Sequence, residues 1–185
     1  MLQSPFYNFS KKVENKITIA LLIANMILIF VMRFFNSILE NNGHNKGIIS
    51  FELAKDLSAS RTILDSWDTL AKTAAGMSLG FDFLFLIVYA LFISILIQKL
   101  NEVVWKQSKI YKLGIILIWG TFLAAFFDCI ENIALIKLLL GDLHQKWSSM
   151  AYYFAISKFT LLFTGLVFIL LSLIILIIKQ IIQKK

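Results

Sequence analysis

Four long apolar segments constrain this chain more than any other feature of its sequence. They cover about residues 17–35, 77–97, 113–140 and 152–178. A helix needs about 20 mostly apolar residues to cross the hydrocarbon core of a bilayer, and in lipid the backbone must satisfy its own hydrogen bonds. The segments are too continuous for the alternating pattern of membrane-barrel strands. The sequence therefore predicts an all-α integral membrane four-helix bundle, a single transmembrane domain over residues 1–185.

The composition agrees with a membrane protein and excludes most soluble classes. Hydrophobic residues make up 59% of the chain and charged residues 16%, against roughly 45–50% and about 25% in soluble domains. The net charge is +7, but the cations flank the apolar segments, so we expect the lipid bilayer as a partner and no nucleic acid. One cysteine and two distant histidines, His44 and His144, give no metal-ligand spacing. We therefore predict no metal and no cofactor.

The distribution of lysines predicts the orientation of the helices. The lysines that flank the segments on one side are Lys11, Lys12, Lys16, Lys99, Lys106, Lys109, Lys112, Lys179, Lys184 and Lys185. On the other side, the loop 141–151 holds Lys146 beside Asp142, and the long loop after the first segment is slightly acidic. Because cytoplasmic loops carry the excess of Lys and Arg, both termini are predicted to be cytoplasmic. We expect a protein of the bacterial inner membrane.

Residues 50–76 form a different kind of segment, apolar on one side and polar on the other. The apolar residues that recur at spacings of three, four or seven are Phe51, Ala54, Leu57, Leu64, Trp67, Ala71 and Ala74. This spacing predicts an extracytoplasmic amphipathic helical segment, with a break at 58–60 where Ser60 caps the second part. Two roles are open for it: a helix on the membrane surface or over the bundle, or a lid on an outward-facing cavity.

Polar and charged residues inside the apolar segments are the candidates for function. Each ionised group costs about 2.5–3.5 kcal/mol at the centre of a membrane helix, so it needs a structural or chemical reason. With a rise of about 1.5 Å per residue, the charged residues of all four segments fall in one layer in the outer half of the membrane. The charged members of this layer are Arg33, Asp82, Asp128, Glu131 and Lys158.

The spacing and charge of this layer predict a site for a proton or a cation. Asp128, Glu131 and Asn132 stand at i, i+3 and i+4 and therefore share one helix face. Three carboxyl groups face one lysine, with Arg33 as a second cation or a boundary anchor, so at least one carboxyl lacks a partner. Close carboxylates in a dry site share a proton or hold a bound cation. The candidate ligand-binding residues are therefore Asp82, Asp128, Glu131, Asn132 and Lys158.

Four short strings, taken together, resemble a known family. They are Phe51-Glu52-Leu53-Ala54, then Asp82-Phe83-Leu84-Phe85 with Tyr89-Ala90, then Asp128-Cys129-Ile130-Glu131-Asn132, and Lys158-Phe159. In this order they resemble a family of small bacterial four-span membrane proteins without an assigned activity. The resemblance implies that the intramembrane acids belong to the family's pattern. In span count and acid placement alone, the chain is similar to sterol-isomerase and sigma-2-receptor-like domains, which hold cationic ligands with such acids.

Three functions are compatible with these residues. The first is binding or moving a small ligand or cation from the outer face. The second is a membrane enzyme on a lipid-like substrate, with one protonated carboxyl as general acid and another as base. The third is a structural or partner subunit whose charges only fix helix packing. The oligomeric state stays open.

Overall fold

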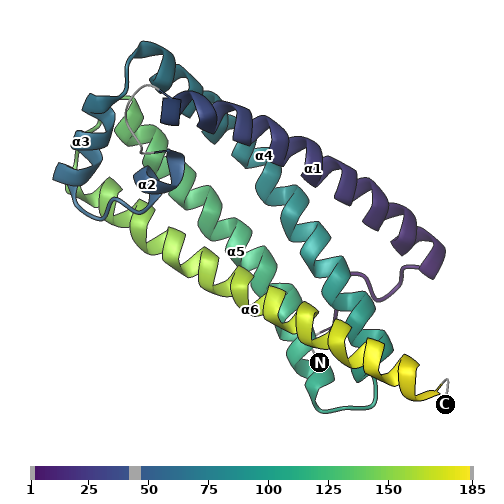
Figure 1. The fold of residues 1–185 in the computed structure, drawn as a ribbon. Coiled ribbons are helices and arrows are strands. Elements are labelled where there is room, and N and C mark those ends of the chain that lie inside the picture. The colour runs from purple at the N-terminus through teal and green to yellow at the C-terminus, as the bar shows by residue number, and fades with distance from the viewer. Residues whose placement is uncertain (1–2, 42–46, 184–185) are drawn as a thin grey trace.

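A computed structural model describes residues 3–41 and 47–183 of the chain. His44, Lys184 and Lys185, which entered the sequence-based expectations, lie outside these residues. Every regular element of the described residues is helical, which confirms the predicted all-α class (Figure 1). The elements are α1 (Lys11–Asn41), α2 (Ile48–Glu52), α3 (Leu57–Ser66), α4 (Thr69–Leu100), the π-helical turn η1 (Asn101–Trp105), α5 (Ile110–Leu139) and α6 (Gln145–Gln183).

Four helices among the described residues are long and apolar enough to cross a membrane. They are α1, α4 with η1, α5 and α6, and the mean hydropathy of their most apolar stretches lies between 2.1 and 3.2. Each helix covers one predicted apolar segment, except that α5 ends at Leu139, one residue before the predicted end. Each also extends beyond its segment; α1, for example, begins at Lys11 and not near residue 17. The extensions exist because the flanking lysines, glutamates and glutamines favour helices, although they contribute no apolar surface.

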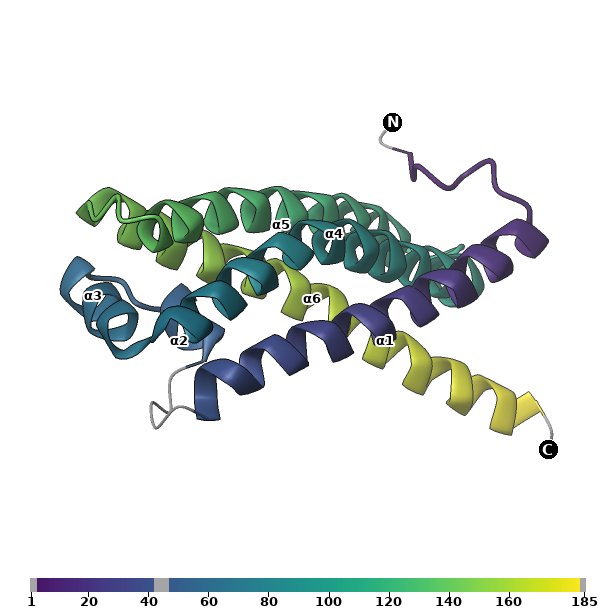
Figure 2. The ribbon, with the colours of Figure 1, turned by 90° about the horizontal axis from the view of Figure 1, so that it is seen from above.

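Among the other spanning helices, α1 packs closely against α4 alone. α5 packs along α6 on one side and along α4 on the other, while α1 packs along α4. α1 and α6 make few contacts with one another and are inclined to each other when the molecule is seen from above (Figure 2). The side of the bundle between α1 and α6 is therefore the least closely packed.

Two apolar clusters occupy the two ends of the bundle. One lies beneath α2 and α3, where Phe51 and Trp67 meet edge to face with ring centroids 5.2 Å apart. The other lies at the opposite end and includes Ile97, Ile118 and Phe168. Burial of apolar and aromatic side chains at both ends fixes the helices. The charged layer lies between these clusters.

Residues 50–76 fold into two short helices and the first turns of α4, so the predicted break at 58–60 is wrong. The breaks fall at 53–56 and at 67–68. Asp68, not Ser60, caps a helix, because its side chain accepts a hydrogen bond of 2.7 Å from the Ala71 amide at the start of α4. Ser60 lies inside α3, where its hydroxyl is 2.9 Å from the Ser148 hydroxyl of α6. That bond ties α3 to the bundle.

Candidate functional site

The five predicted site residues come together from three helices. Asp128, Glu131 and Asn132 lie on one face of α5, as their spacing requires. Asp82 reaches this face from α4 and Lys158 reaches it from α6. All five side chains are buried, with between 0% and 7% of each residue exposed. The cluster therefore joins the three helices that pack most closely.

Lys158 lies among three carboxyl groups. Its Nζ is 2.6 Å from Asp128 Oδ1 and donates a hydrogen bond to it. The same atom is 2.8 Å from Glu131 Oε2 and 3.8 Å from Glu52 Oε2. One ammonium reaches both acids of α5 because they stand one helical turn apart. It thereby links α6 to α5 and α2.

Two further hydrogen bonds extend the cluster. Asn132 Nδ2 donates to Asp82 Oδ2 at 2.6 Å, so Asp82 is held by α5 and not by Lys158. Tyr89 Oη donates to Asp128 Oδ2 at 2.9 Å, so both oxygens of that carboxylate accept a hydrogen bond. Hydrogen bonds to the ionised form stabilise it in a buried site. The carboxylate of Asp128 is thereby linked to both α4 and α6.

Glu52 belongs to the cluster, although sequence reasoning left it on the polar side of the outer segment. The helix α2 turns into the bundle and buries Glu52, which is 8% exposed. Burial raises the pKa of the Glu52 carboxyl, the ammonium of Lys158 opposes this, and the charge of Asp128 adds to it. Glu52 is thus a group that can hold a proton beside the ion pairs of Lys158.

The sequence carries a weak signal for Glu52 and Tyr89, the two cluster residues that are not among the predicted site residues. Tyr89 stands two helical turns after Asp82 and therefore lies on the same face of α4. Glu52 and Tyr89 both occur in the strings that carry the family resemblance. No local spacing predicts that Glu52 faces inward, because its direction depends on how α2 packs against α5 and α6.

The cluster holds more acceptors than the described residues can satisfy. The cluster contains four carboxyl groups and one ammonium, an excess of three negative charges if all are ionised. Within the described residues, Glu131 Oε2 is paired with the Lys158 ammonium, whereas Glu131 Oε1, Asn132 Oδ1 and Ser78 Oγ have no hydrogen-bond partner. Such groups are costly when buried. Protons, water or a bound cation must supply the missing donors.

A cavity of about 390 Å³ borders the cluster. Glu52, Asp82, Asp128 and Lys158 form its polar wall. Its apolar walls come from α1, α2, α4 and α6 and are Ile29, Met32, Ile48, Ile49, Phe85, Ile93, Phe159, Leu162 and Leu166. Arg33, an exposed residue of α1, also lines it. The cavity thus lies between the two helices that make few contacts, with acids on one wall and apolar side chains on the others.

The arrangement of the acids does not suit a metal ion. In the part of the chain that the structure describes, no three acidic, histidine or cysteine side chains are placed to hold one. The ammonium of Lys158 lies between the carboxylates of Asp128 and Glu131.

Comparison of this chain with protein-family models, with curated proteins and with solved structures finds no match. The family resemblance of the four strings therefore stays a prediction.

Proposed function

We propose that this protein binds an amphipathic organic cation, a protonated amine with an apolar tail, in the cavity between α1 and α6. The observation that carries the proposal is a cavity with mostly apolar walls beside four buried carboxyl groups and one ammonium. A ligand ammonium would supply N–H donors and positive charge to the acids. The tail would contact the apolar walls and bury surface there.

The unpaired acceptors support a ligand that donates hydrogen bonds. Asp82 uses one oxygen for Asn132 and lines the cavity with the rest of its side chain. Ser78 lines the same cavity, and its hydroxyl has no partner among the described residues. A primary ammonium has three donors, as a lysine has. It therefore matches this wall better than a neutral or anionic group.

The position of the cavity supports entry from the lipid. α1 and α6 form two of its sides and make few contacts with one another. Both helices expose large apolar side chains, such as Phe30 and Phe163, of the kind that faces lipid tails. An amphipathic molecule dissolved in the bilayer would reach the acids between these helices without crossing water.

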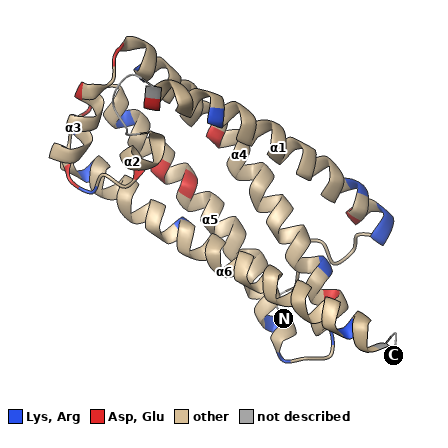
Figure 3. Ribbon diagram, in the orientation of Figure 1, with Lys and Arg blue, Asp and Glu red and all other residues tan. Residues whose placement is uncertain are grey.

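We further propose that the protein lies in a bacterial inner membrane with both termini in the cytoplasm. Lysines gather at the start of α1 and around η1, with Glu14 and Glu102 among them, whereas the other acids occur at the α2–α3 end and within the bundle (Figure 3). The positive-inside rule then places the α2–α3 end outside. The acidic cluster would be nearer to the outer surface, beneath α2.

Thermal unfolding in phosphatidylcholine nanodiscs tests the proposed ligand class. Decylamine, added at pH 7, is expected to raise the Tm of the wild type, while decanol has a much smaller effect. Asp82→Asn removes a carboxylate that faces the cavity and should abolish most of the amine-dependent rise. Asp65→Asn removes an exposed carboxylate of α3 and should keep it. Equal effects of amine and alcohol, or an undiminished rise in Asp82→Asn, would contradict the proposal.

An acid–base enzyme acting on a lipid-like substrate is the second candidate. The observation that favours it is that Glu52 and Asp82 both line the cavity but have different partners. Carboxyls in different environments can serve as general acid and general base. Mass spectrometry of lipids from cells that express the wild type or Asp82→Asn distinguishes an enzyme from a binding protein. An enzyme changes the mass of a lipid in cells with the wild type, and a binding protein does not.

A purely structural role for the charges makes a different prediction. In that case, exchanging Lys158 and Asp128 in one double variant should restore the Tm that each single variant loses, and amines should not stabilise any form.

A further inference from the structure

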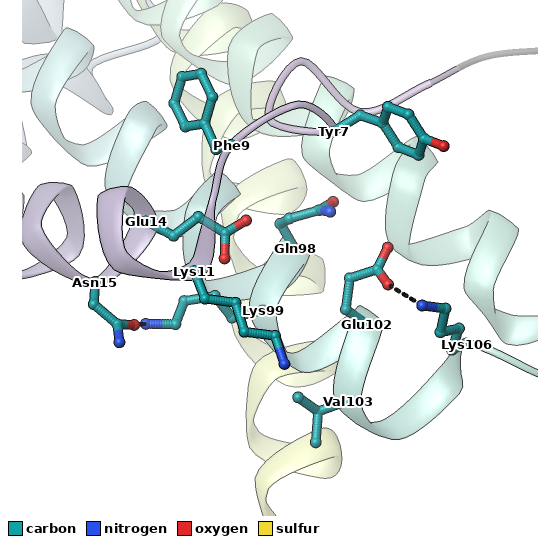
Figure 4. A pocket seen from close by; sticks show the side chains of 10 residues that line it. All are labelled: Tyr7, Phe9, Lys11, Glu14, Asn15, Gln98, Lys99, Glu102, Val103 and Lys106. Atoms are coloured by element: carbon teal, nitrogen blue, oxygen red, sulfur yellow. Dashed lines mark hydrogen bonds and ion pairs between the residues drawn. The ribbon is translucent and has the colours of Figure 1, made fainter.

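A second cavity, of about 500 Å³, lies beside the start of α1, at the end of the bundle opposite to α2 and α3 (Figure 1). Figure 4 shows this cavity from close by. Its walls come from the chain before α1, the first turns of α1, the end of α4 and η1. The residues that line it are Tyr7, Phe9, Lys11, Glu14, Asn15, Gln98, Lys99, Glu102, Val103 and Lys106. It shares no residue with the acidic cavity.

The cavity is lined by charges of both signs. Lys11, Lys99 and Lys106 supply three positive charges, and Glu14 and Glu102 supply two negative ones. Lys99 donates a hydrogen bond of 2.6 Å to Asn15, and Lys106 lies 3.5 Å from Glu102 in a largely exposed ion pair. Exposed pairs of this kind are weak. A ligand with a phosphate and a cation can therefore compete for both sets of charges.

Gln98 gives an independent sign of a ligand. It is only 3% exposed and lines the cavity, and its Oε1 has no hydrogen-bond partner among the described residues. Figure 4 shows its side chain in the same space as those of Glu14 and Glu102. A buried carbonyl oxygen without a donor is costly. Of the two nearby carboxylates, Glu102 already accepts a hydrogen bond from Tyr111 Oη at 2.5 Å and is paired with Lys106. The unpartnered oxygen of Gln98, together with the charge of Glu14 and Glu102, favours a group that donates hydrogen bonds and carries positive charge.

We propose that this cavity binds the headgroup of a membrane phospholipid in which a phosphate is followed by a primary ammonium, as in phosphatidylethanolamine. The lysines hold the phosphate, and Gln98, Glu14 and Glu102 accept hydrogen bonds from the ammonium. Tyr7 and Phe9 lie at the rim, as aromatic residues do at membrane interfaces. The acyl chains extend along the exposed apolar residues beside the cavity, Val13 and Val103.

Native mass spectrometry of the full-length protein, released from micelles with equal amounts of phosphatidylethanolamine, phosphatidylglycerol and phosphatidylcholine, tests the proposal. The wild type is expected to retain the ethanolamine lipid about tenfold over the choline lipid, whose quaternary ammonium has no donor. Gln98→Met removes the acceptor and should bring this ratio close to one. Gln107→Met, at an exposed glutamine outside the cavity, should keep the wild-type ratio. Equal retention of both lipids by the wild type, or an unchanged ratio in Gln98→Met, overturns the proposal.

Two further experiments distinguish the proposed headgroup site from misfolding of the variants and from a site that recognises phosphate alone. Lys11→Gln changes an exposed side chain at the start of α1 and should weaken retention without lowering the Tm, whereas Lys12→Gln should leave retention unchanged. Phosphoethanolamine in solution should displace the bound lipid at lower concentration than inorganic phosphate. Equal displacement by the two would show that only the phosphate is recognised and would overturn the proposal.

Discussion

At the scale of single residues, Lys158 holds the acidic cluster together. Its ammonium lies 2.6 Å from Asp128 and 2.8 Å from Glu131, and the residue is 4% exposed. A buried ion pair contributes little net stability, because desolvation offsets attraction. Removal of one partner is different, since it leaves a buried charge without compensation.

Lys158→Met is therefore expected to destabilise the fold strongly. The loss should be about 3–5 kcal/mol, or roughly 10 °C in Tm for a chain of this size, measured by thermal unfolding in detergent. Adding Asp128→Asn to this variant should recover part of the loss, because one buried charge is removed. Lys137→Met, at an exposed lysine of α5, serves as the control and should change little. A Tm within 2 °C or so of the wild type in Lys158→Met would contradict this role.

Glu52 makes the stability of the folded protein depend on pH. Burial raises its folded-state pKa above the unfolded value, so the folded protein binds more protons than the unfolded chain in the interval between the two. The stability associated with Glu52 is therefore full at low pH. It is lost as the pH rises through the interval up to the folded pKa.

Glu52→Gln removes this dependence. Relative to the wild type, its Tm should rise between pH 5 and pH 8 because the amide needs no proton, and one pKa unit corresponds to about 1.4 kcal/mol. Lys158, Asp128 and Glu131, which face Glu52, are unchanged in both proteins. Thermal unfolding across this range, with the exposed Asp65→Asn as control, provides the measurement. Parallel Tm curves for wild type and Glu52→Gln would refute the assignment.

At the scale of elements, the junction of α4, η1 and α5 depends on one glycine. Asn101 in η1 is fully buried, and its Nδ2 donates to the Tyr111 carbonyl at 2.9 Å. A Cβ at Gly114 of α5 would clash with the side chain of Asn101. The absence of a side chain there allows η1 to lie against α5. The end of α4 and η1 also form a wall of the second cavity.

Gly114→Ala should consequently destabilise this junction by about 1–3 kcal/mol, as overpacking does. Gly120→Ala is a matched control on the same helix, because its nearest neighbour, Leu161, lies at an ordinary contact distance of 3.9 Å. Alanine favours helices by up to about 1 kcal/mol over glycine, so the control should be neutral or more stable. Thermal unfolding of the two variants tests this prediction. Equal stability of Gly114→Ala and Gly120→Ala would show that Asn101 moves away from residue 114 at no cost.

At the scale of the whole molecule, the helices place two chemically different cavities at different depths. The acidic cavity lies toward the α2–α3 end, and the cavity around Gln98 lies at the opposite end. The lysines around η1 and the start of α1 surround the latter. With the proposed orientation, the acids would face the outer half of the bilayer and the lysine-rich cavity would face the cytoplasmic leaflet.

Labelling of single cysteines tests this orientation. In a Cys129→Ser background, the thiol introduced by Asp65→Cys in α3 should react with a membrane-impermeant maleimide added to intact spheroplasts. The thiol introduced by Gln107→Cys, between η1 and α5, should react only after permeabilisation. The physical reason is the excess of lysines at the end that carries residue 107. The reverse pattern of labelling would invert the proposed topology.

The four long helices and part of the candidate site can be predicted from the amino-acid sequence alone. Hydropathy is a local property, and a helix satisfies its backbone within one segment, so apolar length alone predicts each element. The shared face of Asp128, Glu131 and Asn132 follows in the same way from helical geometry. The position of Asp82 and Lys158 near that face follows from their distance to the helix ends.

The contacts between the buried charged groups depend on how the helices pack. Lys158 pairs with Asp128 and Glu131, while Asp82 bonds to Asn132, because the rotation of each helix about its axis depends on its neighbours. Glu52 enters the cluster because α2 turns inward, with the chain breaking at 53–56 and not at the predicted 58–60. Spacing along a chain fixes the faces of one helix, but the contacts between helices are set by packing of whole surfaces, which no short pattern encodes.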